Sequence, residues 1–364
     1  MLPRLAFFAA IFLVLVFAGQ KASAGPALLF EASNGKVLYA EDLDSQWHPA
    51  SLTKIMTAYI TFEAIRQGKI TLDQKIPCSL VATLQPPSKV GLEVGAILTV
   101  EKALQAVIIK SANDVTVMLA EAVSGSETAF VGQMNATAKR LGMTRTNYVN
   151  TNGLPDPGQV TTARDLARLA RAVVTQYPEY ASYWAMPDMR IGNRRLGSHN
   201  ALLKTFPGAD GLKTGFTCDS GFNVVASATR DGRRLMAVVL GETSGNERAI
   251  RAASLLEHGF QSYGWKELFS QNDIDNLPED RSAKGITTVR EQVLSWECGN
   301  RRKRAANPVV ARNKALKEKV AAVKAKAANK KKPEEKQARP ALKGTQVVPA
   351  GSTQSAPQSA DAKP

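Results

Sequence analysis

The first hydrophobic pattern along the chain predicts a hairpin followed by a helix. In residues 27–43, ALLFEASNGKVLYAEDL, residues that favour β-structure flank the Asn-Gly pair at 34–35. Apolar residues then recur at helical spacing over about 52–65, and Gly68 is expected to end that helix.

Helical patterns and then strand patterns follow. The signals over 100–174 are mainly helical, whereas 221–243 contains two apolar β-rich runs around an Asp-Gly pair, and 246–260 has helical spacing again. Strands at both ends of a helical stretch predict an α+β domain, with one antiparallel sheet flanked by helices and an inserted all-α lobe at about 68–205. A cleft between lobe and sheet is the expected place for a site.

The N-terminal residues read as a targeting segment. An apolar run at 5–18 follows a positive charge and precedes the small residues Ala22-Ser23-Ala24, which is typical of a cleaved signal peptide over 1–24. The run is short for a membrane span. We therefore expect a protein secreted across the cytoplasmic membrane, to the periplasm or cell envelope.

The net charge of +15 is concentrated near the C-terminus. Residues 301–343 contain 16 Lys/Arg and 3 Glu, whereas 25–300 contain 28 basic and 28 acidic residues. The Ala/Lys-rich and then Pro/Ser/Ala-rich composition of 301–364 predicts a disordered tail. Secretion makes nucleic acid an unexpected partner, so contact with an anionic membrane or an acidic wall polymer is the hypothesis for this tail.

The cysteines and histidines do not match a cofactor or metal pattern. Cys78, Cys218 and Cys298 are too few for a disulfide framework; any two of them could pair, leaving one free. The three histidines have no metal-ligand spacing. We expect neither a metal nor a cofactor.

Candidate chemistry begins at Ser51 and Lys54, in HPASLTKIMTA. Ser51 stands at the predicted helix start, where free backbone N–H groups can stabilise an oxyanion, and Lys54 lies one turn further on the same face. The pair is either a helix cap beside a surface charge or a nucleophile beside its base. Ser-x-x-Lys also occurs at Ser33 and Lys36, so the motif alone is weak.

Two further motifs strengthen the second interpretation. Ser111 and Asn113 fall in a break between two apolar helical segments, and Lys213-Thr214-Gly215 precedes the strand-rich segment. Gly215 would allow a substrate backbone to approach closely.

These three motifs, in this order, resemble those of the active-site serine penicillin-binding proteins and their β-lactamase relatives. The segments PASLTKIMTA, SANDVTVMLAE, TNGLPDPGQVTTARDLA and DGLKTGF are similar to the low-molecular-mass D-alanyl-D-alanine carboxypeptidases of the peptidase S11 type. The resemblance covers roughly 27–260 and implies a DD-peptidase-like catalytic domain over 25–260, followed by a short extension over 261–300. It also implies removal of the terminal D-alanine from peptidoglycan stem pentapeptides, with β-lactams as covalent inhibitors.

The resemblance also implies a role for each motif residue. Ser51 would be the nucleophile, Lys54 the proton acceptor, Ser111 a relay to the leaving amine, and Asn113 a ligand of the substrate amide that orients Lys54. The oxyanion would be held by two backbone N–H groups, those of Ser51 and of the residue after the Lys-Thr-Gly motif, while basic residues hold the terminal carboxylate. The expected substrate-binding residues are Lys213, Thr214, Gly215, Phe216 and Arg248.

The sequence departs from the family pattern at three places. Asn152 stands where a histidine is common, so the role of that histidine is in doubt here. Cys218 closely follows the Lys-Thr-Gly motif, where a structural or disulfide role is the favoured interpretation. Residues 261–300 are too few for the β-rich domain that usually follows the catalytic body.

Other functions remain as alternatives. A class A β-lactamase requires a glutamate that activates water, but the only glutamate between 150 and 188 is Glu179, and Ala112 replaces the aspartate of the Ser-Asp-Asn motif of those enzymes. An endopeptidase acting on D-alanyl crosslinks would use the same residues. A non-catalytic wall-binding protein would depend on the basic tail.

Overall fold

The computed structural model describes residues 25–267, 272–293 and 298. The predicted signal peptide at 1–24 and the basic tail at 301–364 lie outside the described residues.

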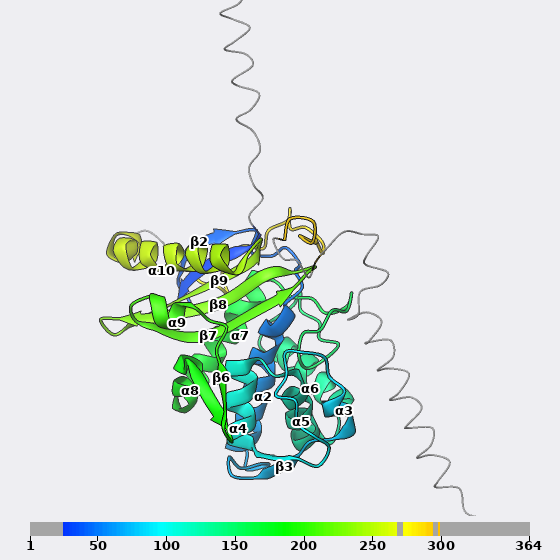
Figure 1. Cartoon of the computed structure of the whole chain (residues 1–364). Coiled ribbons are helices and arrows are strands. Elements are labelled where there is room, and N and C mark those ends of the chain that lie inside the picture. Colours follow the sequence, from blue (N-terminus) through cyan, green and yellow to red (C-terminus); the bar gives the residue numbers. More distant parts are fainter. Residues whose placement is uncertain (1–24, 268–271, 294–297, 299–364) are drawn as a thin grey trace, which may run out of the picture. The chain divides into compact units, whose positions relative to one another are not determined.

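One five-stranded antiparallel sheet organises the structure (Figure 1). Its spatial order is β2-β1-β9-β8-β7, so the N-terminal strand β1 pairs with the late strand β9, as the sequence pattern predicted. The strand β7 is the edge strand nearest the lobe, which leaves its outer side facing the rest of the molecule. The strands are β1 (Ala27–Glu31), β2 (Val37–Glu41), β7 (Ala209–Thr217), β8 (Gly221–Arg230) and β9 (Arg233–Glu242).

Helices cover both faces of this sheet. Successive side chains of its strands point to opposite faces, and apolar side chains occur on both of them. Val224 and Ala226 of β8 pack with Leu256 of α10 (Gly245–Glu267), whereas Val225 between them belongs to the core shared with α7 (Ala163–Gln176). The sheet is therefore the middle of three layers (Figure 1).

The segment between β2 and β7 forms the predicted lobe, which is mainly helical but also contains two short antiparallel sheets. Strands of three or four residues are too short to produce a recognisable period-two pattern, which is why the sequence indicated helices alone here. The helices of this segment, besides α7, are η2 (Ala50–Leu52), α2 (Thr53–Arg66), α3 (Leu80–Thr83), α4 (Val100–Gln105), the π-helical turn η3 (Ala106–Lys110), α5 (Asn113–Ser124), α6 (Glu127–Arg140), η4 (Pro178–Tyr180), α8 (Ala181–Ala185) and α9 (Leu202–Thr205). The short strands are β3 (Lys75–Pro77) with β4 (Ile97–Thr99), and β5 (Asp188–Ile191) with β6 (Arg194–Gly197).

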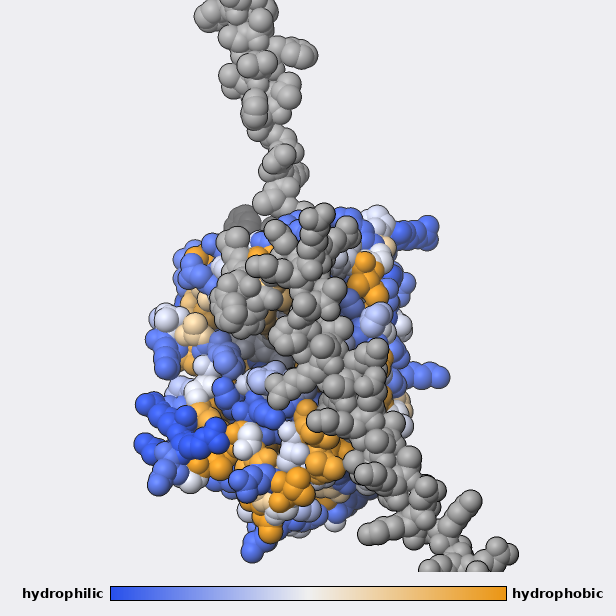
Figure 2. All heavy atoms as spheres, turned by 45° about the vertical axis from the view of Figure 1, so that its right-hand side comes forward, coloured by the Kyte–Doolittle hydropathy of each residue, from blue (hydrophilic) through white to orange (hydrophobic). Residues whose placement is uncertain are grey.

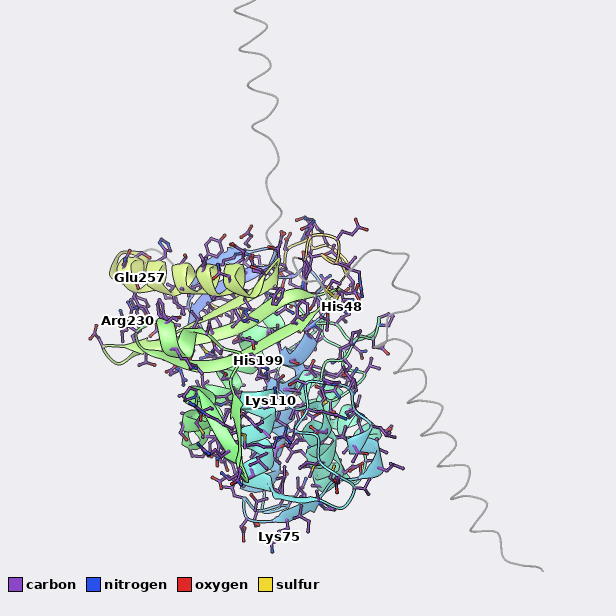
Figure 3. All side chains as sticks on the ribbon, viewed as in Figure 1. His48, Lys75, Lys110, His199, Arg230 and Glu257 are labelled. Carbon is purple, nitrogen blue, oxygen red and sulfur yellow. A yellow bond between two sulfur atoms is a disulfide. The ribbon has the colours of Figure 1, made fainter. Side chains whose placement is uncertain are left out.

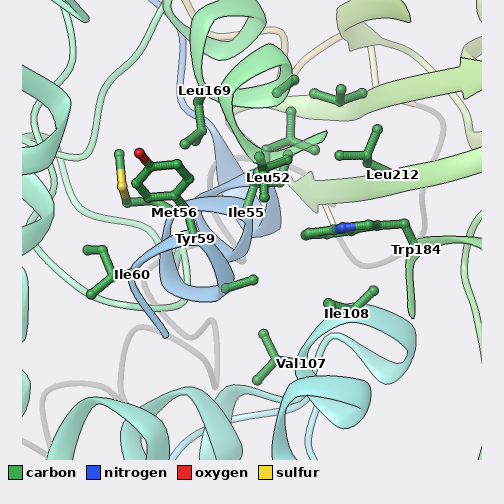
Figure 4. Packing of buried hydrophobic residues seen from close by; sticks show 14 of the residues in the cluster. Leu52, Ile55, Met56, Tyr59, Ile60, Val107, Ile108, Leu169, Trp184 and Leu212 are labelled. Carbon is green, nitrogen blue, oxygen red and sulfur yellow. The ribbon is translucent and has the colours of Figure 1, made fainter. Parts of the chain in front are cut away.

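Helix α2 is buried along most of its length and on all sides. Figure 4 shows its apolar residues between η3, α7 and α8, with Trp184 of α8 close to Leu212 of β7. A helix that is apolar all round belongs in a core rather than at a surface. Any polar side chain on its first turn is consequently removed from water.

The residues after α10 return to the sheet. Cys298 forms a disulfide with Cys218, which directly follows β7, and Arg290 makes a bidentate ion pair with Asp219 at 2.6 and 2.7 Å. Cys78 is a buried free thiol. The pairing that the sequence left open is thus Cys218 with Cys298, which fits the structural role favoured for Cys218.

The described surface is mixed in character. Figure 2 shows hydrophobic side chains among hydrophilic ones on the lower part of this face. Within the segment between β2 and β7, the side chains of Leu80, Val94 and Ile97 are exposed. Across the described ranges, none of the helices is both long enough and apolar enough to span a bilayer.

Candidate active site

Ser51 and Lys54 face each other across one helical turn. Ser51 lies in the turn η2, which leads directly into α2, and its side chain is half-buried, whereas Lys54 is fully buried on the first turn of α2. The distance from Lys54 Nζ to Ser51 Oγ is 3.0 Å. The structure therefore supports a nucleophile–base pair rather than a helix cap, since Ser51 makes no capping hydrogen bond to α2.

Two further oxygens hold the amine of Lys54. Its Nζ lies 2.8 Å from Asn113 Oδ1 and 2.7 Å from the backbone oxygen of Asn152. The amide group of Asn113 is oriented by its Nδ2, which donates to the backbone oxygen of Pro86 at 2.9 Å, so Oδ1 must face the lysine. Both partners are acceptors only, so a neutral Lys54 donates its two protons to them and directs its lone pair at Ser51 Oγ.

The surroundings of Lys54 favour that neutral form. Burial lowers the pKa of Lys54 well below its usual value, and the positive charge of Lys213 lowers it further, against an opposing effect of Asp114. Without this shift, neutralising a lysine at pH 7 would cost about 4.6 kcal/mol. The apolar helix that carries Lys54 is the physical cause of the larger part of the shift.

Ser111, between η3 and α5, has a strained backbone and a side-chain hydroxyl that lacks a hydrogen-bond partner among the described residues. Its backbone is in the left-handed region, with φ +61°, and its Oγ is buried without a hydrogen-bond partner among the described residues. Positive φ is uncommon for a serine, and an unsatisfied buried hydroxyl costs about 1–3 kcal/mol. Strain and an orphaned polar group at one residue are typical of functional sites.

Strand β7 runs against the turn that carries Ser51. A Cβ placed on Gly215 would lie 3.0 Å from the backbone nitrogen of Ser51 and 3.0 Å from the backbone oxygen of Pro49. The close approach explains the glycine, and it brings the Lys213-Thr214-Gly215 motif to the nucleophile. Next along the strand, the ring of Phe216 stacks on that of Phe222 at 4.2 Å between centroids.

A group of cations lies around Lys213, in the middle of β7. Lys213 is buried, and burial followed by the charge of Arg248 lowers its pKa to about 7. Arg248 is only 8% exposed and donates from Nη2 to the backbone oxygen of His199 at 3.3 Å. Partial desolvation, followed by Lys213, Lys110 and Arg248, lowers the pKa of His199 to about 4.

No carboxylate pairs with Lys213 or Arg248 within the described part of the chain. Figure 3 shows His199 and Lys110 at the junction between the sheet and the lobe. Cations held together without a counter-charge raise one another's energy, and an anionic ligand would relieve this repulsion. The arrangement can bind a carboxylate.

Several predicted residues meet in this site. Ser51, Lys54 and Asn113 share hydrogen bonds, Lys213 lies near enough to Lys54 to lower its pKa, and Arg248 lies beside Lys213. Thr214 is buried on β7 between Lys213 and Gly215.

Sequence reasoning missed three contributors to the site. Asn152 acts through its backbone oxygen, an atom that every residue type has and that no sequence motif reveals. His199 and Lys110 were not singled out, although Lys110 directly precedes the motif of Ser111 and Asn113. In the ranges that the structure describes, no group of three or more His, Cys, Asp or Glu side chains is arranged to hold a metal ion.

Sequence comparisons place the chain among known proteins. A sequence model of the D-alanyl-D-alanine carboxypeptidase family, peptidase S11, matches residues 16–244. D-alanyl-D-alanine carboxypeptidase DacF of Bacillus subtilis is 35% identical over 251 residues, which cover 68% of this chain and 64% of the relative. DacC of Escherichia coli is 35% identical over 266 residues, covering 70% and 66% respectively. The chain thus spans just under two thirds of the length of these relatives.

Solved structures give the same picture. Penicillin-binding protein 5 of Haemophilus influenzae is 34% identical, with a TM-score of 0.64 over 66% of this chain and 71% of that one. Penicillin-binding protein D2 of Listeria monocytogenes, in its cefotaxime-bound form, is 32% identical, with a TM-score of 0.60 over 65% and 97%. The α+β fold expected from the sequence, with its antiparallel sheet flanked by helices, is confirmed by these similarities.

Proposed function

The chain belongs to the D-alanyl-D-alanine carboxypeptidase family, peptidase S11, and from this premise we propose that it removes the terminal D-alanine from peptidoglycan stem pentapeptides. The observation that carries the proposal is the amine of Lys54, buried and held 3.0 Å from Ser51 Oγ by two other acceptors. Such an arrangement activates a serine hydroxyl for attack on a carbonyl carbon.

In the acylation step, Ser51 Oγ attacks the carbonyl carbon between the two terminal D-alanines while Lys54 Nζ accepts its proton. The oxyanion that forms would be bound by the backbone N–H groups of Ser51 and Phe216, which belong to two segments in close contact at Gly215. Each donor of this kind typically contributes 10²–10³ in rate. Because these donors belong to the backbone, substitution of the Phe216 side chain need not abolish them.

The amide bond then breaks, and the released D-alanine leaves with a proton. We assign its transfer to Ser111, whose Oγ is buried and has no hydrogen-bond partner among the described residues. Ser111 would donate its own proton to the leaving nitrogen and take up the proton that Lys54 received from Ser51, which leaves Lys54 neutral again. Asn113 Nδ2 keeps a second hydrogen beyond its bond to Pro86 and would donate it to the amide oxygen of the acyl donor. Water later hydrolyses the ester on Ser51 and regenerates the enzyme.

The cations around Lys213 of β7 would bind the terminal carboxylate of the substrate. Lys213 and Arg248 are the charged ligands, and the Thr214 hydroxyl would add a hydrogen bond. With its pKa lowered to about 4, His199 is neutral at pH 7 and adds little positive charge to this group.

The same chemistry makes β-lactams covalent inhibitors of this chain. The β-lactam amide would acylate Ser51 as the substrate does, and we expect slow release. The candidate glutamate for rapid release, Glu179, pairs with Arg66 at 3.2 Å. Arg66 lies twelve residues beyond Lys54 on α2, a distance of about 18 Å along a helix axis. This placement supports a carboxypeptidase rather than a class A β-lactamase.

Murein is assembled and remodelled outside the cytoplasm. We therefore propose that the chain is exported by its N-terminal segment and works at the cell envelope. There it would affect cell shape. Its basic tail, with 16 Lys/Arg between 301 and 343, would contact anionic lipid or wall polymer. Sedimentation with anionic liposomes or murein tests this part, and equal binding after deletion of 301–364 would contradict it.

The test of the activity is release of free D-alanine from a purified stem pentapeptide. We expect one D-alanine per peptide from the wild type and none from Ser51→Ala. Digestion of crosslinked murein dimers separates the alternatives, because an endopeptidase would split the dimers without releasing free D-alanine.

A further inference from the structure

The C-terminal extension, residues 272–293, binds the turn that joins β7 to β8. In Figure 1 the extension is orange and lies at one end of the sheet. Its contacts converge on Asp219 in this turn. Arg290 donates to both carboxylate oxygens at 2.6 and 2.7 Å, Thr288 Oγ1 donates to Oδ1 at 3.2 Å, and the backbone nitrogen of Val289 donates to the backbone oxygen of Asp219 at 3.2 Å. Three consecutive residues of the extension therefore hold one residue of the turn.

This contact is tightly packed and largely shielded from water. The side chain of Arg290 is only 15% exposed, and Val289 is buried. A Cβ placed on Gly221, at the start of β8, would lie 2.8 Å from Val289 Cγ2, so a larger residue there would push the extension away. The disulfide of Cys218 attaches the same turn covalently. A shielded bidentate pair of this kind fixes both position and direction.

The turn passes the position of Asp219 on to strand β7. Ser220 is fully buried; its Oγ accepts from the backbone nitrogen of Thr217 at 3.0 Å, and its backbone nitrogen donates to Thr217 Oγ1 at 3.1 Å. Thr217 directly follows Phe216, whose backbone N–H is one of the proposed oxyanion donors. Because β7 is an edge strand, β8 is its neighbour on one side only. The position of Phe216 therefore depends on β8 and on this turn.

The same extension also holds the segment before the nucleophile. The backbone nitrogen of Gln46 donates to the backbone oxygen of Lys284 at 3.0 Å. The next residue, Trp47, is buried, and its Nε1 donates to the backbone oxygen of Ser220 at 2.9 Å. This segment leads into the turn η2 with Ser51, whose backbone N–H is the other proposed donor. The extension and the β7–β8 turn thus connect the two segments from which the donors come.

We infer that the C-terminal extension positions the oxyanion hole, and that Arg290 is a positioning residue for the acylation of Ser51. Arg290 holds Asp219, the turn holds Thr217, and the N–H of Phe216 is thereby directed at the developing oxyanion. A donor that is fixed in advance requires no reorganisation when the charge forms. The inference rests on the proposed function, from which it takes the acyl transfer and its two donors.

The test separates the rate of the reaction from the binding of the substrate, with kcat and KM measured for release of D-alanine from a purified stem pentapeptide. Arg290→Ala should lower kcat by about tenfold, less than the roughly 10²–10³ lost with a whole donor, because the disulfide and β8 still hold the strand. KM should stay near the wild-type value, since Lys213 and Arg248 would bind the terminal carboxylate independently of the turn. Arg290→Lys can still donate to Asp219 and should recover part of the rate.

Two further variants show whether the ion pair itself is responsible. Asp219→Ala breaks the pair from its other side and should cause the same loss, and the double variant should lose no more than either single one. The matched control is Asp275→Ala, which breaks another ion pair of the extension, with Arg168 at 2.9 Å. It should keep the wild-type kcat. Denaturant titration of each variant gives its stability, and all rates are measured well below the melting temperatures.

The outcomes separate this inference from the proposed function. A wild-type kcat in folded Arg290→Ala, a change confined to KM, unequal losses in Arg290→Ala and Asp219→Ala, or the same loss in Asp275→Ala would each overturn the positioning role and leave the carboxypeptidase activity standing. If the wild type releases no D-alanine, the proposed function is overturned, and the inference falls with it.

Discussion

Gly153 offers the sharpest test of how the active site is held together. Its φ is +83°, and a Cβ added there would lie 1.7 Å from the backbone oxygen of Ala50, the residue before the nucleophile. Gly95 has nearly the same φ, +84°, but a Cβ there would meet nothing within 4 Å. The variants Gly153→Ala and Gly95→Ala therefore share the same backbone strain and differ in the clash.

The size of the effect follows from these contacts. Both variants lose about 1–2 kcal/mol of stability, because an alanine is placed in the left-handed region. In Gly153→Ala the loop must also retreat by at least about 1.3 Å to relieve the contact from 1.7 Å to 3.0 Å. Asn152 moves with it, and its backbone oxygen, now 2.7 Å from Lys54 Nζ, leaves hydrogen-bond range. Misplacement of a catalytic group by about 1 Å costs on the order of 10² in rate.

The assay is the second-order rate constant for labelling by a fluorescent penicillin, measured well below the melting temperature of each variant. We expect a loss of about 10² for Gly153→Ala and a wild-type rate for Gly95→Ala. The unfolding free energy should fall in both variants, and further in Gly153→Ala, because the clash adds to the shared backbone strain. A wild-type labelling rate in folded Gly153→Ala would refute the reasoning, since it would mean that the loop does not hold Lys54.

Three further predictions follow from individual groups. Ser111→Ala removes an unsatisfied buried hydroxyl, so the unfolding free energy should stay equal or rise by about 1 kcal/mol, while D-alanine release falls by at least about 10²; a matching loss of stability in denaturant titration would contradict the relay role. Lys213→Ala removes a charge that lowers the pKa of Lys54, so the rising limb of the penicillin acylation rate against pH should move to higher pH. Lys213→Arg keeps the charge and should leave the limb nearly in place. An unmoved limb in Lys213→Ala would show that the two amines do not interact. Loss of the Cys218–Cys298 crosslink in Cys298→Ser should lower the unfolding free energy by about 2–4 kcal/mol, and a reductant should destabilise the wild type but not this variant; equal melting temperatures would count against the crosslink.

Much of the fold could be predicted because its elements are long and periodic. The hairpin at β1 and β2, the helix α2, the strands β8 and β9 and the final helix all match the hydrophobic pattern, and the break at Ser111 separates η3 from α5 as predicted. The short sheets β3–β4 and β5–β6 were missed, because pairing between distant segments decides whether such brief runs become strands.

The site could be predicted where side chains carry the chemistry. Ser51, Lys54 and Asn113 belong to short motifs that can be recognised in the sequence, and the structure brings them into hydrogen-bond contact. The backbone oxygen of Asn152 could not be predicted in this way. Its residue was noted only as a departure from the family pattern, yet its main chain holds Lys54 regardless of the side chain.

The disulfide pairing could not be predicted from the sequence, for a different reason. Three cysteines allow three pairings, and neither spacing nor composition selects one of them. Cys298 pairs with Cys218 because the chain after α10 returns to the end of β7. The ion pair of Arg290 with Asp219 holds the same segment there. Those contacts are tertiary and leave no local pattern.

Tandem mass spectrometry of the protein after incubation with benzylpenicillin tests the central claim most directly, because it identifies the residue that is acylated. The account predicts one penicilloyl group per molecule, attached to Ser51 and absent from Ser51→Ala. An unmodified protein, or a penicilloyl group on any other residue, would contradict it.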